Sequence, residues 1–291
     1  MSLFKNNNLV SPSLSIPKPV VYFAKTTQFI SHKLVVFFAT KLFSTPINFS
    51  TPKRELAMKE SAQNKKIFIS SIQKEIHILS YGFSDKKVLL CHGWAGRSTQ
   101  LFMIAHKLLE KGYMVVSFDG PAHGESTGKT TNLIEYIETI KSITEEFGPF
   151  DAAVGHSFGA MGILNANSNE ILFKCMVTVG SGDKIPDILE NFTRNLGLKK
   201  IIAAKMERYF MKKWNIQLAP FAASEAAKKI KIPTLVIHDS ADGDVAVSCA
   251  INIRQNLEKG SLYITNGLGH TKILRDKIVT NKIIGFIIQN T

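Results

Sequence analysis

The chain has 291 residues, of which 45% are hydrophobic and 20% are charged, a composition typical of globular proteins rather than disordered or fibrous ones. This length can hold one large α/β domain or two small ones around a sizeable core. The net charge is +13 at pH 7, but no nucleic-acid-reading motif accompanies it, so nucleic acid is not an expected partner.

Residues 1–62 form a basic and apolar N-terminal segment, which we expect to be partly helical and packed on the main domain. Its longest apolar run, 34–43, is too short to span a bilayer. Residues 1–54 carry seven Lys or Arg and no acid, so peripheral contact with a membrane surface is an alternative role. Cys91, Cys175 and Cys249 form no C-x-x-C pair, which argues against a zinc site or disulfide framework and favours a cytoplasmic location.

Residues 63–291 read as one α/β domain in which strands and helices alternate. Short apolar runs predict two strands, 66–70 and 74–82, that pair with each other. Further strands are predicted at 87–93, 113–120, 150–157, 173–182, 232–239 and 260–265. Helical spacing predicts helices at 98–111, 130–146, 158–167 and 271–289. Apolar strands that alternate with helices indicate a mostly parallel sheet covered on both faces.

A candidate nucleophile stands where a predicted strand passes into a predicted helix. The sequence GHSFGA, residues 155–160, fits G-x-S-x-G with Gly155, Ser157 and Gly159. Such a sharp turn needs glycines because side chains there would crowd the backbone, and it presents the serine hydroxyl at the carboxyl edge of the sheet. We therefore predict that Ser157 is a catalytic nucleophile.

A serine nucleophile requires a base and an acid that orients the base. His270 lies in the glycine-rich loop NGLGHTKI between the last strand and the last helix, so it is the predicted base. Asp242, at the crest of HDSADGDV, is the predicted acid, with Asp244 as the alternative. A calcium loop is disfavoured because Ala246 and Ile253 stand where oxygen ligands would be needed.

The oxyanion of an acyl intermediate requires two hydrogen-bond donors. The backbone N–H of Phe158, directly after the nucleophile, is the first candidate. The second is the N–H of Trp94 in HGWAG, where Gly93 lets the backbone approach closely. We expect no metal and no organic cofactor at this site.

Five segments in order, HGWAG, FDGPAHGES, GHSFGA, HDSADGDV and GLGH, resemble the α/β-hydrolase superfamily, in its esterase- and lipase-like serine-hydrolase branch. The resemblance implies an eight-stranded, mostly parallel sheet flanked by helices. It also implies a nucleophile after strand five, an acid after strand seven and a histidine after strand eight. Ser157 argues against the dehalogenase and epoxide hydrolase branches, which have aspartate there. Ala246 departs from the proline that relatives often carry.

The resemblance also implies a helical lid between strands six and seven, at about 181–231. Its helical stretches, 185–198 and 199–214, have apolar residues at helical spacing, which we interpret mainly as a packed face.

Together these features predict a serine hydrolase that cleaves a small carboxylic ester or thioester through an acyl-enzyme. Two alternatives are an amide, peptide or carbon–carbon bond hydrolase with the same residues, and a binding protein of this fold without turnover. The sequence does not indicate the oligomeric state.

Overall fold

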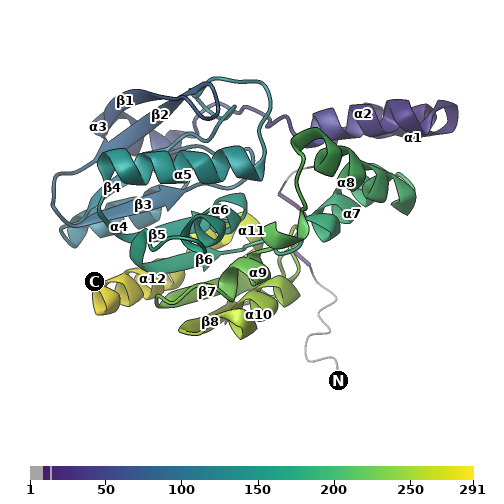
Figure 1. The fold of residues 1–291 in the computed structure, drawn as a ribbon. Coiled ribbons are helices and arrows are strands. Elements are labelled where there is room, and N and C mark those ends of the chain that lie inside the picture. Colours follow the sequence, from purple (N-terminus) through teal and green to yellow (C-terminus); the bar gives the residue numbers. More distant parts are fainter. Residues whose placement is uncertain (1–8, 14) are drawn as a thin grey trace.

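A computed structural model describes residues 9–13 and 15–291 (Figure 1), so residues 1–8 and 14 of the predicted N-terminal segment lie outside the described residues. The strands form one eight-stranded sheet in the order β1-β2-β4-β3-β5-β6-β7-β8. β2 pairs antiparallel with β1 and β4, and all other pairs are parallel. The strands are β1 (Gln63–Ile69), β2 (Lys74–Tyr81), β3 (Lys87–Cys91), β4 (Met114–Phe118), β5 (Phe150–His156), β6 (Phe173–Val179), β7 (Thr234–Asp239) and β8 (Gly260–Thr265). The predicted mostly parallel sheet is confirmed.

Helices cover both faces of this sheet (Figure 1). They are α1 (Lys18–Ile30), α2 (His32–Phe43), α3 (Leu56–Ser61), α4 (Phe102–Glu110), α5 (Leu133–Phe147), α6 (Phe158–Asn167), α7 (Ile185–Asn195), α8 (Lys200–Trp214), α9 (Ala223–Ala227), α10 (Val247–Asn256), α11 (Gly269–Lys272) and α12 (Lys277–Asn290). One apolar cluster joins the sheet to α5, α6, α9 and α10, and another joins it to α4 and α12. In the part of the chain that the structure describes, every helix is too short or too polar to cross a bilayer.

The central strands read as apolar runs because both of their faces are covered. All six residues of β7 are buried, and in β6 only Lys174 is exposed. In β5 only Asp151 is less than fully buried. Because β5, β7 and β8 run in the same direction, the loops that follow them meet at one edge of the sheet.

The insertion between β6 and β7 consists of α7, α8 and α9, as the helical lid prediction required. Its first two helices pack on α1 and α2 in a third apolar cluster, which lies to one side of the sheet (Figure 1). Val35 and Val36 of α2 belong to this cluster together with Ile202 and Met206 of α8. The N-terminal helices thus pack mainly on the inserted helices, because both pairs have an apolar face that needs a partner.

The last predicted helix, 271–289, is divided in the structure. α11 and a short 3-10 turn, Ile273–Arg275, come first, and α12 starts at Lys277. Asp276 separates the two parts, and its side chain accepts a hydrogen bond of 2.9 Å from the N–H of Val279, as an N-cap residue does. His270 therefore lies in a short separate helix rather than before a long one.

Candidate active site

Ser157 stands in a strained turn between β5 and α6. Its φ of 52° and ψ of −112° lie in a region that residues other than glycine rarely adopt. The turn is held in place because the Ser157 N–H donates to the carbonyl of Val179 at 2.8 Å, and its own carbonyl accepts from Met161 N–H at 3.1 Å. The backbone thus fixes the hydroxyl at the edge of the sheet.

The two glycines of the turn are required by close backbone contacts. A Cβ atom on Gly155 would lie 2.6 Å from the carbonyl oxygen of Gly159, and one on Gly159 would collide with the carbonyl oxygens of Cys91 and His92. Backbone atoms cannot move away from such contacts as a flexible side chain can. These clashes explain the glycines that flank Ser157 in the sequence.

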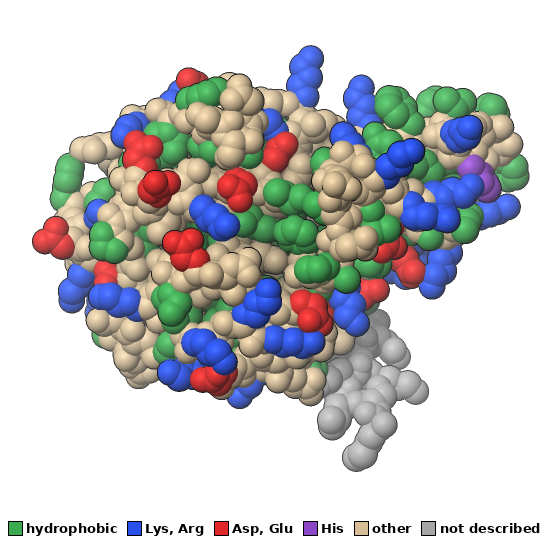
Figure 2. Space-filling view, in the orientation of Figure 1, with side chains coloured by type: hydrophobic (Ala, Val, Ile, Leu, Met, Phe, Trp, Pro, Cys, Tyr) green, Lys and Arg blue, Asp and Glu red, His purple; other side chains and the backbone are tan. Residues whose placement is uncertain are grey.

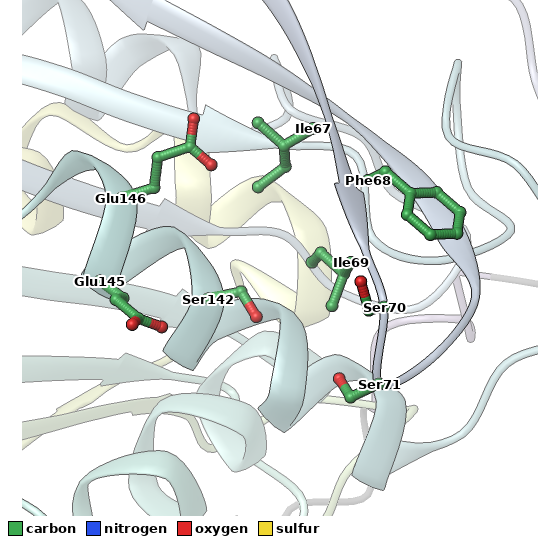
Figure 3. A pocket seen from close by; sticks show the side chains of 8 residues that line it. All are labelled: Ile67, Phe68, Ile69, Ser70, Ser71, Ser142, Glu145 and Glu146. Carbon is green, nitrogen blue, oxygen red and sulfur yellow. The ribbon is translucent and has the colours of Figure 1, made fainter.

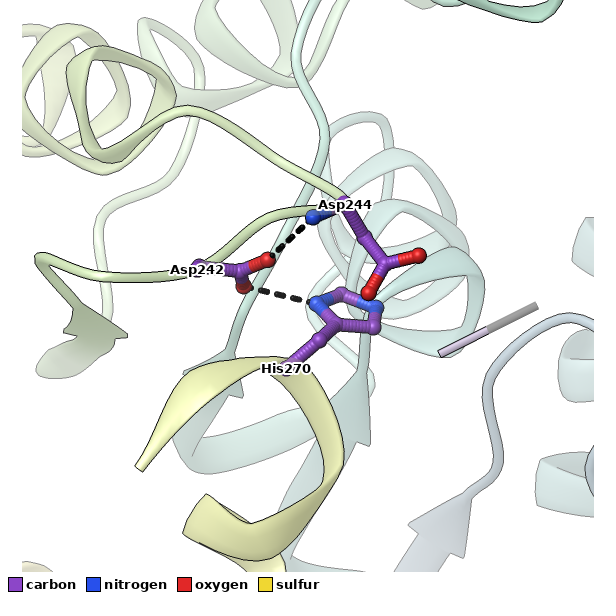
Figure 4. Close-up of side chains that lie close together, drawn as sticks. All are labelled: Asp242, Asp244 and His270. Carbon is purple, nitrogen blue, oxygen red and sulfur yellow. Dashed lines mark hydrogen bonds and ion pairs between the residues drawn. The ribbon is translucent and has the colours of Figure 1, made fainter. Parts of the chain in front are cut away.

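Ser157, His270 and Asp242 form one hydrogen-bonded chain across three loops. The Oγ of Ser157 lies 2.9 Å from Nε2 of His270. Nδ1 of His270 lies 2.7 Å from Oδ2 of Asp242 (Figure 4). An ionised carboxylate only accepts hydrogen bonds, so Nδ1 donates to Asp242 and Nε2 accepts from the serine hydroxyl. The tautomer that a general base requires follows from this geometry.

Asp242 is almost completely buried and is held from two sides. Its Oδ1 accepts from the N–H groups of Asp244 at 2.8 Å and Val245 at 2.9 Å, while Oδ2 faces His270. Burial opposes ionisation of this carboxyl, but the hydrogen bond and electrostatic attraction of His270 and the hydrogen bond from the Val245 N–H outweigh it and lower its pKa. Asp242 is thus an ionised, fixed acceptor.

The other two aspartates of the loop hold the backbone. Asp239 accepts hydrogen bonds from the N–H groups of Ala241, Gly267 and Leu268, so one carboxylate ties the loop after β7 to the loop after β8. Asp244 accepts from the N–H and the hydroxyl of Ser13. The three carboxylates of the stretch therefore have three different partners.

Residues 9–13 cross the two loops that carry Asp242 and His270. The N–H of Val10 donates to the carbonyl of Ala241 at 2.8 Å. Cβ atoms added to Gly243 or Gly269 would collide with Val10, so both glycines make room for this segment. The sequence does not predict this contact, because nothing in the composition of this segment indicates a partner.

The predicted oxyanion donors are the N–H groups of Phe158, which directly follows Ser157, and of Trp94, which directly follows Gly93. Phe158 begins α6, where the first N–H groups have no acceptor within the helix. Within residues 9–13 and 15–291, neither the Phe158 N–H nor the Trp94 N–H donates to another residue. Gly93 lies against the nucleophile, since a Cβ atom added there would be 3.2 Å from Cβ of Ser157. Both predicted donors are thus unused, one directly after Ser157 and the other next to Gly93.

Buried histidines support the loop that carries Trp94, and the sequence analysis assigned them no role. His92 Nδ1 donates to the carbonyl of Gly93 and its Nε2 accepts from Gly120 N–H, while His123 accepts from Ala95 N–H. Burial lowers the pKa of His123 to about 3. Burial also lowers the pKa of His92. Both rings are therefore neutral, with one nitrogen donating and one accepting. The histidines within HGWAG and GPAHGES were the only sequence signal for this role.

Asp119 connects the same loop to the sheet. Its carboxylate accepts from the N–H groups of Ser98 and Glu125 and faces Nδ1 of His77 at 3.0 Å. Burial opposes ionisation, but these donors prevail and lower the pKa of Asp119 well below its usual value. α4 begins at Phe102 rather than at the predicted Ser98.

Asp242, Asp244 and His270 also bring ligand atoms within 4.8 Å of one another, close enough to be considered for a metal ion (Figure 4). Each of these groups already has a hydrogen-bond partner: Asp242 has His270, His270 has Ser157, and Asp244 has Ser13. A metal would have to replace all three interactions. The arrangement suits proton transfer from a hydroxyl better than ligation.

Aromatic rings from separate elements gather around the two donor loops. Trp94 meets Phe158 edge to face, with ring centroids 5.3 Å apart, and stacks on Phe43 of α2 at 6.3 Å. Phe43 also meets Phe192 of α7 at 5.1 Å. The N-terminal helices and the lid therefore both contribute to an apolar wall beside the site.

A cavity of about 260 Å³ between β1 and α5 shares no residue with these loops (Figure 3). It is lined by Ile67, Phe68, Ile69, Ser70, Ser71, Ser142, Glu145 and Glu146. No histidine lies among these residues, so its serines lack a base. Glu146 is paired with Lys65 at 2.6 Å. This cavity offers no comparable chemistry.

The family model of the alpha/beta hydrolase fold matches residues 86–228. An esterase of Pyrococcus furiosus is 18% identical, with a TM-score of 0.64, and the match covers 84% of this chain and 97% of that one. The chain has the α/β-hydrolase fold. This α/β-hydrolase-fold protein is also similar to an esterase of Exiguobacterium antarcticum, with 16% identity and a TM-score of 0.62 over 78% of this chain and 100% of that one. It is likewise similar to a bromoperoxidase of Bacillus anthracis, with 17% identity and a TM-score of 0.60 over 78% of this chain and 100% of that one. No curated protein sequence matches it. Such low identities establish the fold, and the reaction must be argued from the site.

Proposed function

We propose that this α/β-hydrolase-fold protein is a serine hydrolase that cleaves a carboxylic ester or thioester through an acyl-enzyme. The observation that carries the proposal is the hydrogen-bonded chain of Ser157, His270 and Asp242, with distances of 2.9 Å and 2.7 Å. The unused N–H groups of Phe158 and Trp94 support it, since Phe158 directly follows Ser157 and Gly93, next to Trp94, lies against Ser157. The esterases among its structural neighbours are consistent with this reaction class.

In the proposed acylation step, Ser157 Oγ attacks the substrate carbonyl carbon while Nε2 of His270 takes the hydroxyl proton. Asp242 stabilises the resulting imidazolium through Nδ1. The carbonyl oxygen becomes an oxyanion and accepts from the N–H groups of Phe158 and Trp94. The intermediate then collapses, the alcohol or thiol leaves with the proton from His270, and the acyl group stays on Ser157.

Deacylation repeats these steps with water as the nucleophile. His270 removes a proton from water, the hydroxide attacks the acyl carbon, and Ser157 leaves with the proton as the carboxylic acid forms. Fixed backbone donors contribute because they need no reorganisation as charge develops, and a single oxyanion donor is typically worth about 10²- to 10³-fold in kcat.

The substrate side of the proposal rests on the aromatic wall. Trp94, Phe158 and Phe43 favour an apolar acyl or aryl group beside Ser157 over a highly charged one. Amides, peptides and activated carbon–carbon bonds could be cleaved by the same residues, and a binding protein without turnover would retain the same wall. Covalent reactivity of Ser157 distinguishes a hydrolase from a binding protein without turnover.

Fluorophosphonate labelling tests the proposed function. We expect the folded protein to form one covalent adduct at Ser157, because a phosphonate reacts with a serine that has a base and then resembles the tetrahedral intermediate. Mass spectrometry of the digested protein locates the adduct, and heat-denatured protein serves as the control. A folded protein without an adduct at Ser157 would favour the binding protein.

We also propose that α1 and α2 attach the protein to an anionic membrane surface. These helices contain four lysines and no acidic residue. Their outer side leaves several large apolar side chains exposed, which gather at one end of the molecule next to basic side chains (Figure 2): Tyr22, Phe23, Phe29, Ile30, Leu34 and Phe37. Aromatic side chains beside lysines suit the boundary between lipid headgroups and acyl chains.

Co-sedimentation with liposomes tests this attachment. Phe29 and Phe37 are exposed by 82% and 59%, so Phe29→Ser with Phe37→Ser should leave the fold intact and weaken binding to phosphatidylserine-containing vesicles by about tenfold or more. Phe68→Ser with Phe83→Ser is the matched control, since both rings are exposed but lie outside these helices. Equal binding by wild type and both variants would refute the attachment.

A further inference from the structure

A second cavity, of about 250 Å³, adjoins the candidate active site and contains three arginines. Arg54 comes from the turn before α3, Arg97 from the loop after β3 and Arg275 from the turn after α11. The residues that share the cavity with them include Ala95, Gly96 and Thr271. Three separate parts of the chain thus bring guanidinium groups to one place.

These arginines are poorly neutralised by their surroundings. Glu55 is the only acidic residue among those that line the cavity, and its Oε2 already accepts a hydrogen bond of 2.7 Å from the hydroxyl of Thr99. Arg97 Nε lies 3.9 Å from the same oxygen, a distance too long for a hydrogen bond. Three guanidinium groups against one carboxylate leave an excess of two positive charges.

Arg54 and Arg275 lack directly bonded partners among the residues that the structure describes. Among residues 9–13 and 15–291, neither guanidinium makes a hydrogen bond or an ion pair. Partial burial of Arg275, followed by the charge of Arg54, lowers the pKa of the Arg275 guanidinium, and the opposing attraction of Glu55 does not cancel these effects. Like charges held together with too little counter-charge favour the binding of an anion.

The position of the cavity connects it to the candidate active site. Ala95 and Gly96 directly follow Trp94, one of the two free donors, and Thr271 directly follows His270. The cavity therefore shares its walls with two of the loops around Ser157. An anion bound there would contact both loops at once.

We propose that the cavity formed by Arg54, Arg97 and Arg275 binds a phosphate group. Guanidinium groups present paired donors that match phosphate oxygens, and a doubly charged phosphate would balance the excess of two positive charges. The phosphate could belong to the leaving group of the acyl substrate or to a separate ligand. Phosphate binding itself is independent of the proposed hydrolysis. The assignment of the phosphate to the leaving group of an acyl substrate rests on the proposed function.

Phosphate binding is tested with inorganic phosphate by calorimetry and by thermal unfolding at constant ionic strength. We expect wild type to bind phosphate, and Arg54→Gln with Arg275→Gln to bind it about 10- to 100-fold more weakly. The single variant Arg54→Gln is included because this side chain is exposed and its loss should not disturb folding. Arg194→Gln with Arg208→Gln removes the same charge from exposed positions on α7 and α8, and should bind like wild type.

Two pairs of measurements distinguish the two possible origins of the phosphate group, the acyl substrate and a separate ligand. If the phosphate belongs to the substrate, loss of the arginines lowers kcat/KM for acyl-4′-phosphopantetheine by about tenfold or more and leaves that for acyl-pantetheine unchanged. If it belongs to a separate ligand, inorganic phosphate changes the rate on acyl-pantetheine in wild type but not in the arginine variant. Either result supports the site.

The proposal is overturned if phosphate and chloride have equal effects on wild type, or if both Arg54→Gln and the double variant bind phosphate as wild type does. Calorimetry requires no turnover, so phosphate binding would be detected even if the protein hydrolysed nothing. Failure of the proposed function and failure of this site therefore give different results.

Discussion

Replacing Ser157 by alanine is expected to lower kcat for ester hydrolysis by about 10⁶-fold, the order of loss found when a triad serine is removed. The reason is that the hydroxyl 2.9 Å from His270 Nε2 is the only group at this turn that can form an acyl-enzyme. Alanine cannot accept the acyl group, and the remaining backbone donors can only stabilise direct attack by water. The measurement is turnover of chromogenic esters over a range of acyl chain lengths.

Ser181→Ala is a matched control for this substitution. Ser181 is buried in the loop after β6, and its hydroxyl donates to the carbonyl of Gly182, so its loss should cost stability rather than turnover. Thermal unfolding of both variants checks that each remains folded. Hydrolysis by Ser157→Ala at the wild-type rate would show that the acyl group is transferred elsewhere.

Asp242→Asn is expected to lower kcat by about 10⁴-fold, the order found when a triad aspartate is replaced by asparagine. An asparagine can present an N–H group to Nδ1 of His270, which would favour the tautomer with its proton on Nε2. That nitrogen then cannot accept the proton of Ser157. The steady-state rate between pH 5 and 9 measures the effect, which we expect to lessen at high pH as hydroxide becomes the base.

Asp244→Asn tests the alternative acid in the same assay. Asp244 accepts from Ser13, and it is the Asp244 backbone N–H, rather than its side chain, that contacts Asp242. Its substitution should therefore change kcat by less than about tenfold. If Asp244→Asn abolished turnover and Asp242→Asn did not, the assignment of the acid would be wrong.

The features of this protein that could be predicted are those with a signal in the neighbouring sequence. Buried parallel strands read as apolar runs, and the turn at Ser157 requires glycines that the sequence displays. The order of the strands also follows from the resemblance to a known superfamily. The hydrogen-bonded chain joins residues that follow β5, β7 and β8, whose carboxyl ends lie at one edge of the sheet, so these residues could be selected as candidates without knowledge of distances.

The features that escaped prediction depend on contacts between distant segments. Nothing near Val10 or Ser13 indicates that they cross the loops of Asp242 and His270, and Arg54 is separated from Arg275 by most of the chain. The packing of α1 and α2 on the lid was equally hidden, since an amphipathic helix reveals that it needs a partner but not which partner it has. The roles of His92 and His123 in supporting the Trp94 loop also escaped prediction, because in the sequence they look like ordinary residues of glycine-rich loops.

The shared apolar cluster of α1, α2, α7 and α8 constrains how the lid can open. Swinging α7 and α8 away by themselves would expose the buried faces of Val35, Ile202 and Met206 to water, at a cost that rises with every methyl group uncovered. The lower-energy movement carries all four helices as one rigid body. Such a body would hinge on four connections, those before α1, after α2, before α7 and after α8. Because Phe43 stacks on Trp94, each opening would also change the contact of these helices with the loop after β3.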